Sequence, residues 1–227
     1  MSSNPLSDEK IVDSWMKNAA PWIAAIRDGQ IESRLACTDD AAVEAVMGCS
    51  PKSALDLGCG EGWLTRKLSE QGIDMIGVNV VPKLIEEAQR IRPGDYRVVS
   101  YEDLAAGHFN NTVDVIVCNF SLLGKEPVEY AVRTAKTLLN NGGSFVVQTP
   151  HPVIACGVEP YQDGWRKGSW DGFAEEFTDP APWYFRTLSS WVNLFISNGY
   201  YLREVREPIH PGSGKPASVI LIAGTST

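Results

Sequence analysis

Three glycines at alternate positions constrain the fold of this chain more than any other feature. Gly58, Gly60 and Gly62 follow a short apolar run at 53–57 and precede a segment with helical spacing. Glycine lets the backbone turn tightly and pass close to a ligand, and the first turn of a helix offers free amide groups. In α/β sheets, such a strand, turn and helix bind nucleotide-like ligands at the carboxyl end of the strand.

Apolar runs and helical patterns alternate along the rest of the chain. The expected strands span residues 53–57, 74–78, 96–99, 113–118, 144–148, 201–205 and 217–222. The expected helices begin near Gly62, Pro82, Pro127 and Thr187, and the helix after Pro127 runs to Leu139. This alternation predicts a Rossmann-like α/β fold with helices on both faces of the sheet. The last two strands have no helical pattern between them, so we expect them to pair antiparallel.

A length of 227 residues predicts one domain with additions rather than two domains. Residues 1–50 have a helical pattern and are expected to form an N-terminal cap over the core at 53–149. Residues 150–186 are rich in proline, glycine and aromatic residues, which predicts an irregular insertion. Residues 187–227 are expected to supply the final helix and two strands.

Composition narrows the classes of function. The net charge of -8 argues against nucleic-acid binding, because phosphate contacts need a basic surface. The cysteines are odd in number and have no metal-ligand spacing, so we expect reduced thiols, no metal site and a cytoplasmic protein. The N-terminus has no signal-peptide pattern, and no apolar run approaches the roughly 18 residues that span a membrane, so no membrane contact is expected.

The glycine spacing distinguishes between cofactors. A dinucleotide fingerprint would place glycine where Trp63 stands, and the Gly-Lys-Ser/Thr of a phosphate-binding loop is absent. The sequence from Asp56 to Gly62 reads D-x-G-x-G-x-G, which resembles motif I of the class I methyltransferases that depend on S-adenosylmethionine (SAM), small-molecule type. The resemblance covers residues 53–224 and implies a seven-stranded, mostly parallel sheet whose last strand is antiparallel. It also implies SAM as cofactor and S-adenosylhomocysteine (SAH) as product.

The resemblance assigns one group of residues to the methionine end of the cofactor. These are Arg34, Asp56, Gly58, Cys59, Gly60 and Asn119. The backbone of the glycine turn would pack against the methionine, and Asn119 ends the fourth expected strand. Arg34 lies in the N-terminal cap, and a guanidinium can bind a carboxylate through two hydrogen bonds.

A second group is assigned to the nucleoside end by the same resemblance. Asn79 and Val80 follow the second strand, where the family usually has an acidic residue that accepts hydrogen bonds from both ribose hydroxyls. An amide offers one acceptor and one donor group instead, so we expect SAM affinity to be about tenfold lower than is typical. Ser100, Tyr101 and Glu102 follow the third strand and are expected to meet the adenine.

The acceptor site is predicted from aromatic residues. Eight of the chain's 21 aromatic side chains fall within residues 151–186. Ligand pockets are mostly apolar, so we expect a lid that shapes a pocket for a small aromatic or apolar acceptor, with Tyr161, Trp165, Trp183 and Tyr184 as candidate contacts. A satellite core or a homodimer surface is the alternative.

Methyl transfer from a sulfonium proceeds by in-line displacement, so it depends mainly on alignment. A base helps when the acceptor is a hydroxyl or a protonated nitrogen. His151 follows the fifth strand and is the candidate base, with a structural histidine as the alternative.

Three other functions stay open to different degrees. A methyltransferase acting on protein or RNA is one alternative, and it is weakened for nucleobase or glutamine amide methylation, because residues 119–122 read Asn-Phe-Ser-Leu and not an amino-methylating Asn-Pro-Pro-Tyr signature. A non-catalytic binding module of the same fold is kept open by Asn79. A nicotinamide-dependent oxidoreductase is disfavoured by Trp63 and by the missing ribose carboxylate.

Overall fold

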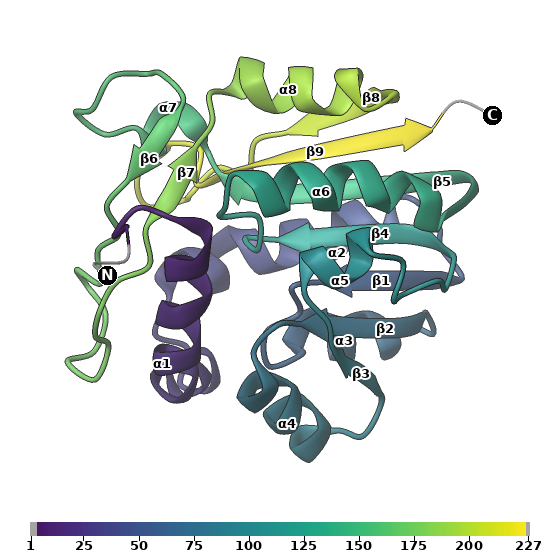
Figure 1. The fold of residues 1–227 in the computed structure, drawn as a ribbon, viewed down its shortest axis with the longest axis horizontal. Coiled ribbons are helices and arrows are strands. Elements are labelled where there is room, and N and C mark those ends of the chain that lie inside the picture. The colour runs from purple at the N-terminus through teal and green to yellow at the C-terminus, as the bar shows by residue number, and fades with distance from the viewer. Residues whose placement is uncertain (1–3, 226–227) are drawn as a thin grey trace.

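A seven-stranded sheet with the order β3-β2-β1-β4-β5-β9-β8 forms the centre of the computed structural model, which describes residues 4–225 (Figure 1). Its strands are β1 (Ser53–Leu57), β2 (Asp74–Asn79), β3 (Asp95–Val98), β4 (Val113–Asn119), β5 (Leu139–Pro150), β8 (Tyr200–Arg206) and β9 (Ser218–Thr225). The pairs among β1 to β5 are parallel, and β9 pairs antiparallel with both β5 and β8. The predicted sheet, including its antiparallel last strand, is confirmed.

Helices cover both faces of this sheet. They are α1 (Asp8–Arg27), η1 (Arg34–Thr38), α2 (Asp39–Met47), α3 (Trp63–Ser69), α4 (Pro82–Ile91), α5 (Tyr101–Ala105), α6 (Glu126–Ala135), η2 (Lys136–Leu138), α7 (Pro152–Ala155) and α8 (Leu188–Ser197). On one face, α5, α6 and α8 bury Leu104, Val128 and Phe195 in a single apolar cluster with the sheet. On the other, α2 and α3 bury Ala45 and Leu64 in a second cluster. These two layers fix the sheet rigidly and leave its strand ends available for loops.

The helix that begins near Pro127 is shorter than the sequence pattern predicts. It ends at Ala135, and the 3-10 turn η2 follows. Leu139 then pairs with Val113 of β4 before a shift of register at Val113/Val115, so Leu139 belongs to β5. Leu138 is buried from the 3-10 turn, as it would be from an α-helix. The apolar pattern of the sequence predicts that Leu138 is buried, but it does not distinguish an α-helix from a 3-10 turn at this residue.

The insertion after β5 carries a small hairpin, β6 (Gly164–Arg166) with β7 (Trp183–Phe185), which lies near α1 in Figure 1. The side chain of Asn18 in α1 donates to Thr178 O at 2.7 Å and accepts from Thr178 N at 2.9 Å. Lys17 of the same helix contacts Asp179 at 2.7 Å. The cap and the insertion are therefore joined. Across residues 4–225, none of the helices combines the length and the apolar character that crossing a membrane requires.

Candidate active site

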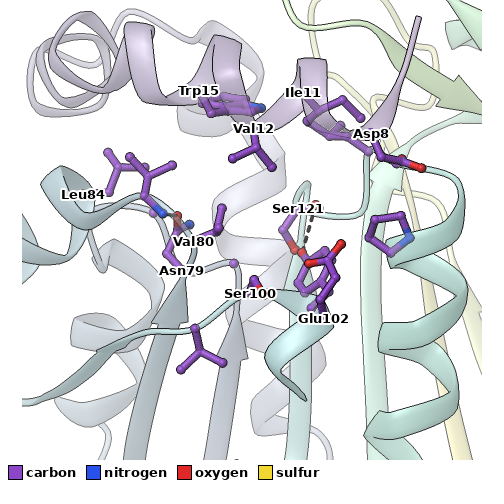
Figure 2. A pocket seen from close by; sticks show the side chains of 18 of the residues that line it. Asp8, Ile11, Val12, Trp15, Asn79, Val80, Leu84, Ser100, Glu102 and Ser121 are labelled. Carbon is purple, nitrogen blue, oxygen red and sulfur yellow. Dashed lines mark hydrogen bonds between the residues drawn. The ribbon is translucent and has the colours of Figure 1, made fainter. Parts of the chain in front are cut away.

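A cavity of about 460 Å³ opens at the carboxyl ends of β1, β2 and β4, beneath α1. In Figure 2, α1 crosses above the cavity, and Val12 points down toward Val80, which rises from the loop after β2. The helix contributes Asp8, Glu9, Ile11, Val12, Trp15 and Trp22 to the walls. The sequence predicted a helical cap, but it did not single out these six side chains.

The glycine turn forms the floor of this cavity. Gly58 has a φ of 88°, in the left-handed region that favours glycine. A Cβ at Gly58 would collide with the side chain of Ser121, so the turn needs glycine for contact as well as for conformation. The Ser121 hydroxyl donates to Leu57 O at 2.7 Å. This bond ties the loop after β4 to the end of β1, and both strands present backbone to the cavity.

Asp56 lies beneath the turn and does not reach the cavity wall. Its carboxylate accepts a hydrogen bond from the Thr65 hydroxyl of α3 at 2.8 Å, and the side chain is 1% exposed. Burial raises the pKa of Asp56 to about 7, the Thr65 hydrogen bond opposes this, and the nearby Glu61 raises it further. The Glu61 carboxylate is also buried and is paired with Arg66 at 3.2 Å. Asp56 thus supports the turn from below.

Asn79 lines the cavity at the end of β2 with a fixed orientation. Its Oδ1 accepts a hydrogen bond from Val81 N at 2.9 Å, which identifies the amide oxygen and leaves the amide nitrogen for other partners. Within the described residues, that nitrogen makes no hydrogen bond. The cavity therefore receives a donor at this position, where a carboxylate would supply an acceptor. Val80 lies beside it on the wall.

Residues after β3 form the next part of the wall. Ser100 begins α5, and its hydroxyl accepts from Asp103 N at 3.0 Å in a reciprocal capping arrangement. The Tyr101 hydroxyl donates to Ser121 O at 3.0 Å, and burial raises the pKa of this phenol. Glu102 is exposed and borders the cavity. Ser100, Tyr101 and Glu102 thus lie together with Gly58, Gly60, Asn79 and Val80 around one space.

The charges around this cavity have one sign. Among the described residues that line it, the charged side chains are Asp8, Glu9 and Glu102, all acidic. The Asp8 carboxylate accepts hydrogen bonds from Lys125 N at 2.7 Å and Glu126 N at 3.3 Å, so it is held at the N-terminus of α6. The cavity is therefore suited to a ligand with positive charge.

A second cavity of about 240 Å³ adjoins the first. Trp15 and Leu123 line both cavities, so they form a shared wall. The aromatic residues of the second cavity are Trp15, Trp170, Trp183, Tyr184, Phe185 and Trp191. Four of them, Trp170, Trp183, Tyr184 and Phe185, belong to the insertion. The structure thus places a mostly apolar cavity beside a cavity whose charged side chains are acidic.

Residues 36–205 match the family model described as a methyltransferase domain. The chain belongs to this family. The family predicted from the glycine turn is therefore confirmed. The match begins at η1 and ends in β8, so it contains the glycine turn, the sheet strands up to β8 and the aromatic insertion. Helix α1 lies before it.

Curated relatives of this methyltransferase domain match a shorter stretch. The ubiquinone biosynthesis O-methyltransferase of Chromobacterium violaceum is 34% identical over 97 residues, which covers 40% of this chain and 41% of the relative. The enzyme of the same name from Cupriavidus pinatubonensis is 27% identical over 111 residues, 47% of this chain and 45% of the relative. The chain therefore spans less than half the length of the curated relatives it matches.

Solved structures share the fold of this methyltransferase domain. An S-adenosylmethionine-dependent methyltransferase from Mesorhizobium loti aligns with a TM-score of 0.62 and 20% identity, covering 82% of this chain and 99% of that one. The 1,6-didemethyltoxoflavin-N1-methyltransferase of Burkholderia thailandensis, with bound 1,6-didemethyltoxoflavin and S-adenosylhomocysteine, aligns with a TM-score of 0.64 and 15% identity, covering 96% and 91%. At these identities the likeness establishes the fold.

Besides Asp56, three predicted cofactor contacts of the methyltransferase domain lie off the cavity wall. Arg34 donates to Asp39 at 2.9 Å, and its guanidinium lies 4.6 Å from the centre of the Trp63 ring. Cys59 is buried in an apolar cluster with α4. Asn119 is partly covered, and its Oδ1 is buried without a hydrogen-bond partner among residues 4–225.

The predicted substrate contacts of the methyltransferase domain divide into two pairs. Trp183 and Tyr184 line the second cavity. Tyr161 instead accepts a hydrogen bond from Leu188 N at 2.9 Å, at the start of α8. Trp165 packs edge-on against Tyr184 with ring centres 5.6 Å apart. Tyr161 and Trp165 therefore support the hairpin that carries the lining residues.

His151, the candidate base, lies at the end of β5 but lines neither cavity. Its Nε2 lies 2.7 Å from Glu207 Oε1, and its side chain is 6% exposed. Its Nδ1 is buried and makes no hydrogen bond to any residue that the structure describes. The neighbouring Pro150 and Pro152 do line the second cavity. This arrangement favours a histidine that anchors the loop between β8 and β9.

Proposed function

We propose that this chain transfers a methyl group from SAM to a small organic acceptor. One observation carries the proposal: two cavities share the wall formed by Trp15 and Leu123, and the first is floored by the glycine turn. A donor in the first cavity and an acceptor in the second would meet at that wall. Membership of the methyltransferase domain family supports this assignment.

The first cavity fits the cofactor in size and charge. A volume of about 460 Å³ lies within the range of small-ligand sites. SAM has a net positive charge, and the charged side chains described on the wall are acidic. When bound, SAM supplies an electrophilic methyl group on its sulfonium. We assign the ribose to Asn79 and Val80, and the adenine to Ser100, Tyr101 and Glu102.

The methionine end would lie over the glycine turn. Gly58 and Gly60 line the cavity there, Cys59 stays a proposed contact between them, and Asp56 holds the turn from below. Arg34 and Asn119 remain proposals for this end. Arg34 would have to exchange its charge-assisted bond to Asp39 for one to the ligand carboxylate.

The residues of the second cavity would position the acceptor and exclude water. Its aromatic walls suit a flat, mostly apolar molecule. Alignment of two reactants in a closed site supplies a large share of rate acceleration. The names of the relatives, an O-methyltransferase of ubiquinone biosynthesis and an N1-methyltransferase of 1,6-didemethyltoxoflavin, fit a small organic acceptor.

Calorimetry with SAM and SAH tests the cofactor assignment. We expect micromolar binding in the native protein and its loss in Gly60→Arg, because an arginine there would fill the floor of the cavity. Gly72→Arg is the matched control: Gly72 also has a positive φ, 85°, but open space surrounds its Cβ direction. No binding of either ligand by the native protein would overturn the proposal.

Transfer of a labelled methyl group from SAM to a panel of small ring compounds separates an enzyme from a binding module. Tight SAM binding without transfer to any of them would favour the binding module that Asn79 keeps open. The cytoplasmic location stays a prediction. So does the homodimer, which sedimentation of the concentrated protein would exclude if the protein runs as a monomer.

A further inference from the structure

The second cavity contains a buried cation. Among the described residues that line it, Arg186 is the one charged side chain, and no acidic residue joins it. Its side chain is 4% exposed. This charge pattern is the reverse of that in the first cavity, whose charged side chains are acidic. The two adjoining cavities are therefore complementary to ligands of opposite charge.

The partners of Arg186 leave its charge only partly compensated. Nη1 donates to Gly124 O at 2.7 Å and Nη2 to Lys125 O at 2.9 Å, and both acceptors are neutral carbonyls. The nearest carboxylate, that of Glu129, lies 3.8 Å from Nη2 and is 43% exposed. Burial lowers the pKa of Arg186, and the carboxylates of Glu129, Asp163 and Asp8 oppose this only in part. A buried charge is costly unless it is paired, so an anion in this cavity would be strongly favoured.

Donors of Arg186 remain for such an anion. A guanidinium has five N–H groups in one plane. Within residues 4–225, Nε makes no hydrogen bond, and each terminal nitrogen uses one N–H for a carbonyl. The guanidinium carbon lies 4.8 Å from the centre of the Tyr184 ring and 5.3 Å from that of Trp191. These rings hold the guanidinium plane in place, so the remaining donors are preorganised.

We propose that the methyl acceptor is a small aromatic acid whose carboxylate is bound by Arg186. Its ring would pack among Trp170, Trp183 and Tyr184, which line the same cavity. This inference rests on the proposed function, because it takes the second cavity as the acceptor site. It adds a charge requirement that aromatic walls alone do not impose.

The native protein provides the first test. Benzoate, 4-hydroxybenzoate, indole-3-acetate and 1-naphthoate would each be titrated by calorimetry at saturating SAH, beside the corresponding primary amide. Acid and amide match in shape and differ in charge. We expect at least one acid to bind tenfold or more tightly than its amide. If no acid exceeds its amide while SAH binds normally, this inference is overturned and the proposed function stands. Absence of SAH binding would overturn the proposed function instead.

Three variants locate the effect. Arg186→Met should remove the preference for the acid, and Arg186→Lys should keep part of it, because lysine keeps the charge but not the planar donors. Arg166→Met is the matched control. Arg166 also bonds two backbone carbonyls and lies over Phe185, but it does not line the cavity. An unchanged preference in folded Arg186→Met would overturn the proposal. If that variant does not fold, the native comparison and Arg186→Lys decide, and full retention of the preference by lysine would contradict binding through the planar donors of the guanidinium.

Discussion

The carboxylate of Asp8, in the first turn of α1, accepts a hydrogen bond of 2.7 Å from the backbone amide of Lys125, 117 residues later in the chain. The same carboxylate accepts from Glu126 N, so it caps α6 from another helix. A Cβ at Gly124 would collide with Asp8, so the loop must bear glycine for this approach. These hydrogen bonds thus join α1, which covers the first cavity, to α6, which packs against the sheet.

Asp8→Ala should weaken the attachment of α1 to the N-terminus of α6. The loss of a carboxylate at a helix N-terminus costs about 1 kcal/mol of stability, and a looser α1 should weaken SAH binding several-fold. Thermal unfolding and calorimetry measure the two effects. Asp13→Ala is the control, since Asp13 is an exposed residue of the same helix and pairs with Lys10 and Lys17 near the surface. Exposed pairs contribute little, so equal effects of both variants would contradict a specific role for Asp8.

Asn79→Asp should bind SAH about tenfold more tightly, equivalent to about 1.4 kcal/mol. One carboxylate oxygen can keep the bond to Val81 N, and the second can accept from a ribose hydroxyl. Asn79→Ala removes both groups and should bind more weakly than the native protein. Calorimetry gives the three affinities. Equal or weaker binding by the aspartate variant would show that the amide nitrogen is the better partner.

Asp56→Asn should change how stability depends on pH. The folded chain holds a proton on Asp56 up to about pH 7, whereas the ordinary carboxyl releases it near 3.8. Because the pKa is raised by folding, this group's contribution is present at low pH and is lost as pH rises through that window, by at most about 1.4 kcal/mol per pH unit.

Denaturant unfolding at pH 5 and pH 8 checks this prediction. Relative to Asp56→Asn, the native protein should be about 2 kcal/mol more stable at pH 5 than at pH 8. Thr65→Val removes the hydrogen bond that lowers this pKa, so the loss of stability should extend to higher pH. A difference that stays constant between the two pH values would mean that Asp56 is ionised throughout.

Gly58→Ala should destabilise the fold and abolish SAH binding. Its backbone is left-handed, and the added methyl would also collide with Ser121. Gly72→Ala separates the two effects, because Gly72 has a similar φ but nothing within 4 Å of the Cβ position. We expect a cost of about 1 kcal/mol for Gly72→Ala, from the backbone alone, and a larger one for Gly58→Ala. Similar unfolding midpoints would argue against the close approach.

His151→Gln should lower stability by about 1 kcal/mol through the loss of the Glu207 contact. Because His151 lines neither cavity, we expect the transfer rate at saturating substrate to change less than about threefold. Glu207→Gln should have the same effect on stability. A loss of rate of about a hundredfold, together with loss of the fall in rate at low pH that a general base causes, would instead support the histidine as the general base.

The arrangement of the core could be predicted because its signals are local. The strand before Gly58 and the apolar spacing after Pro82 each specify one element, and parallel topology brings their ends together. The resemblance to the methyltransferases assigned Asn79 and Ser100 to one cofactor, and both follow strand ends that lie at the edge of one cavity. Residues whose position is set by the end of a strand can therefore be predicted from the sequence.

Other parts of the site depend on contacts between distant segments. Asp8 and Trp15 reach the cavity only because α1 is attached to Thr178 and Lys125, and no periodicity marks such a pairing. Arg186 has no motif around it, and its burial beside aromatic rings appears only once the hairpin is formed. Tyr161 was predicted to contact the acceptor but does not line the second cavity. Its hydroxyl instead bonds the start of α8, so an aromatic residue of the insertion can have a structural role.

Helix α1 lies before the residues that match the family model, yet it covers the first cavity (Figure 2). The residues that match the family model therefore contain the floor of this cavity, while α1 closes it. A change of side chain in α1 would thus alter the cover of the cavity without altering the glycine turn. Because α1 also contacts the insertion at Thr178, a substitution that adapts one cavity to a new ligand would also shift residues that line the other cavity. The preference of the first cavity for its ligand and that of the second cavity for the acceptor would then change together.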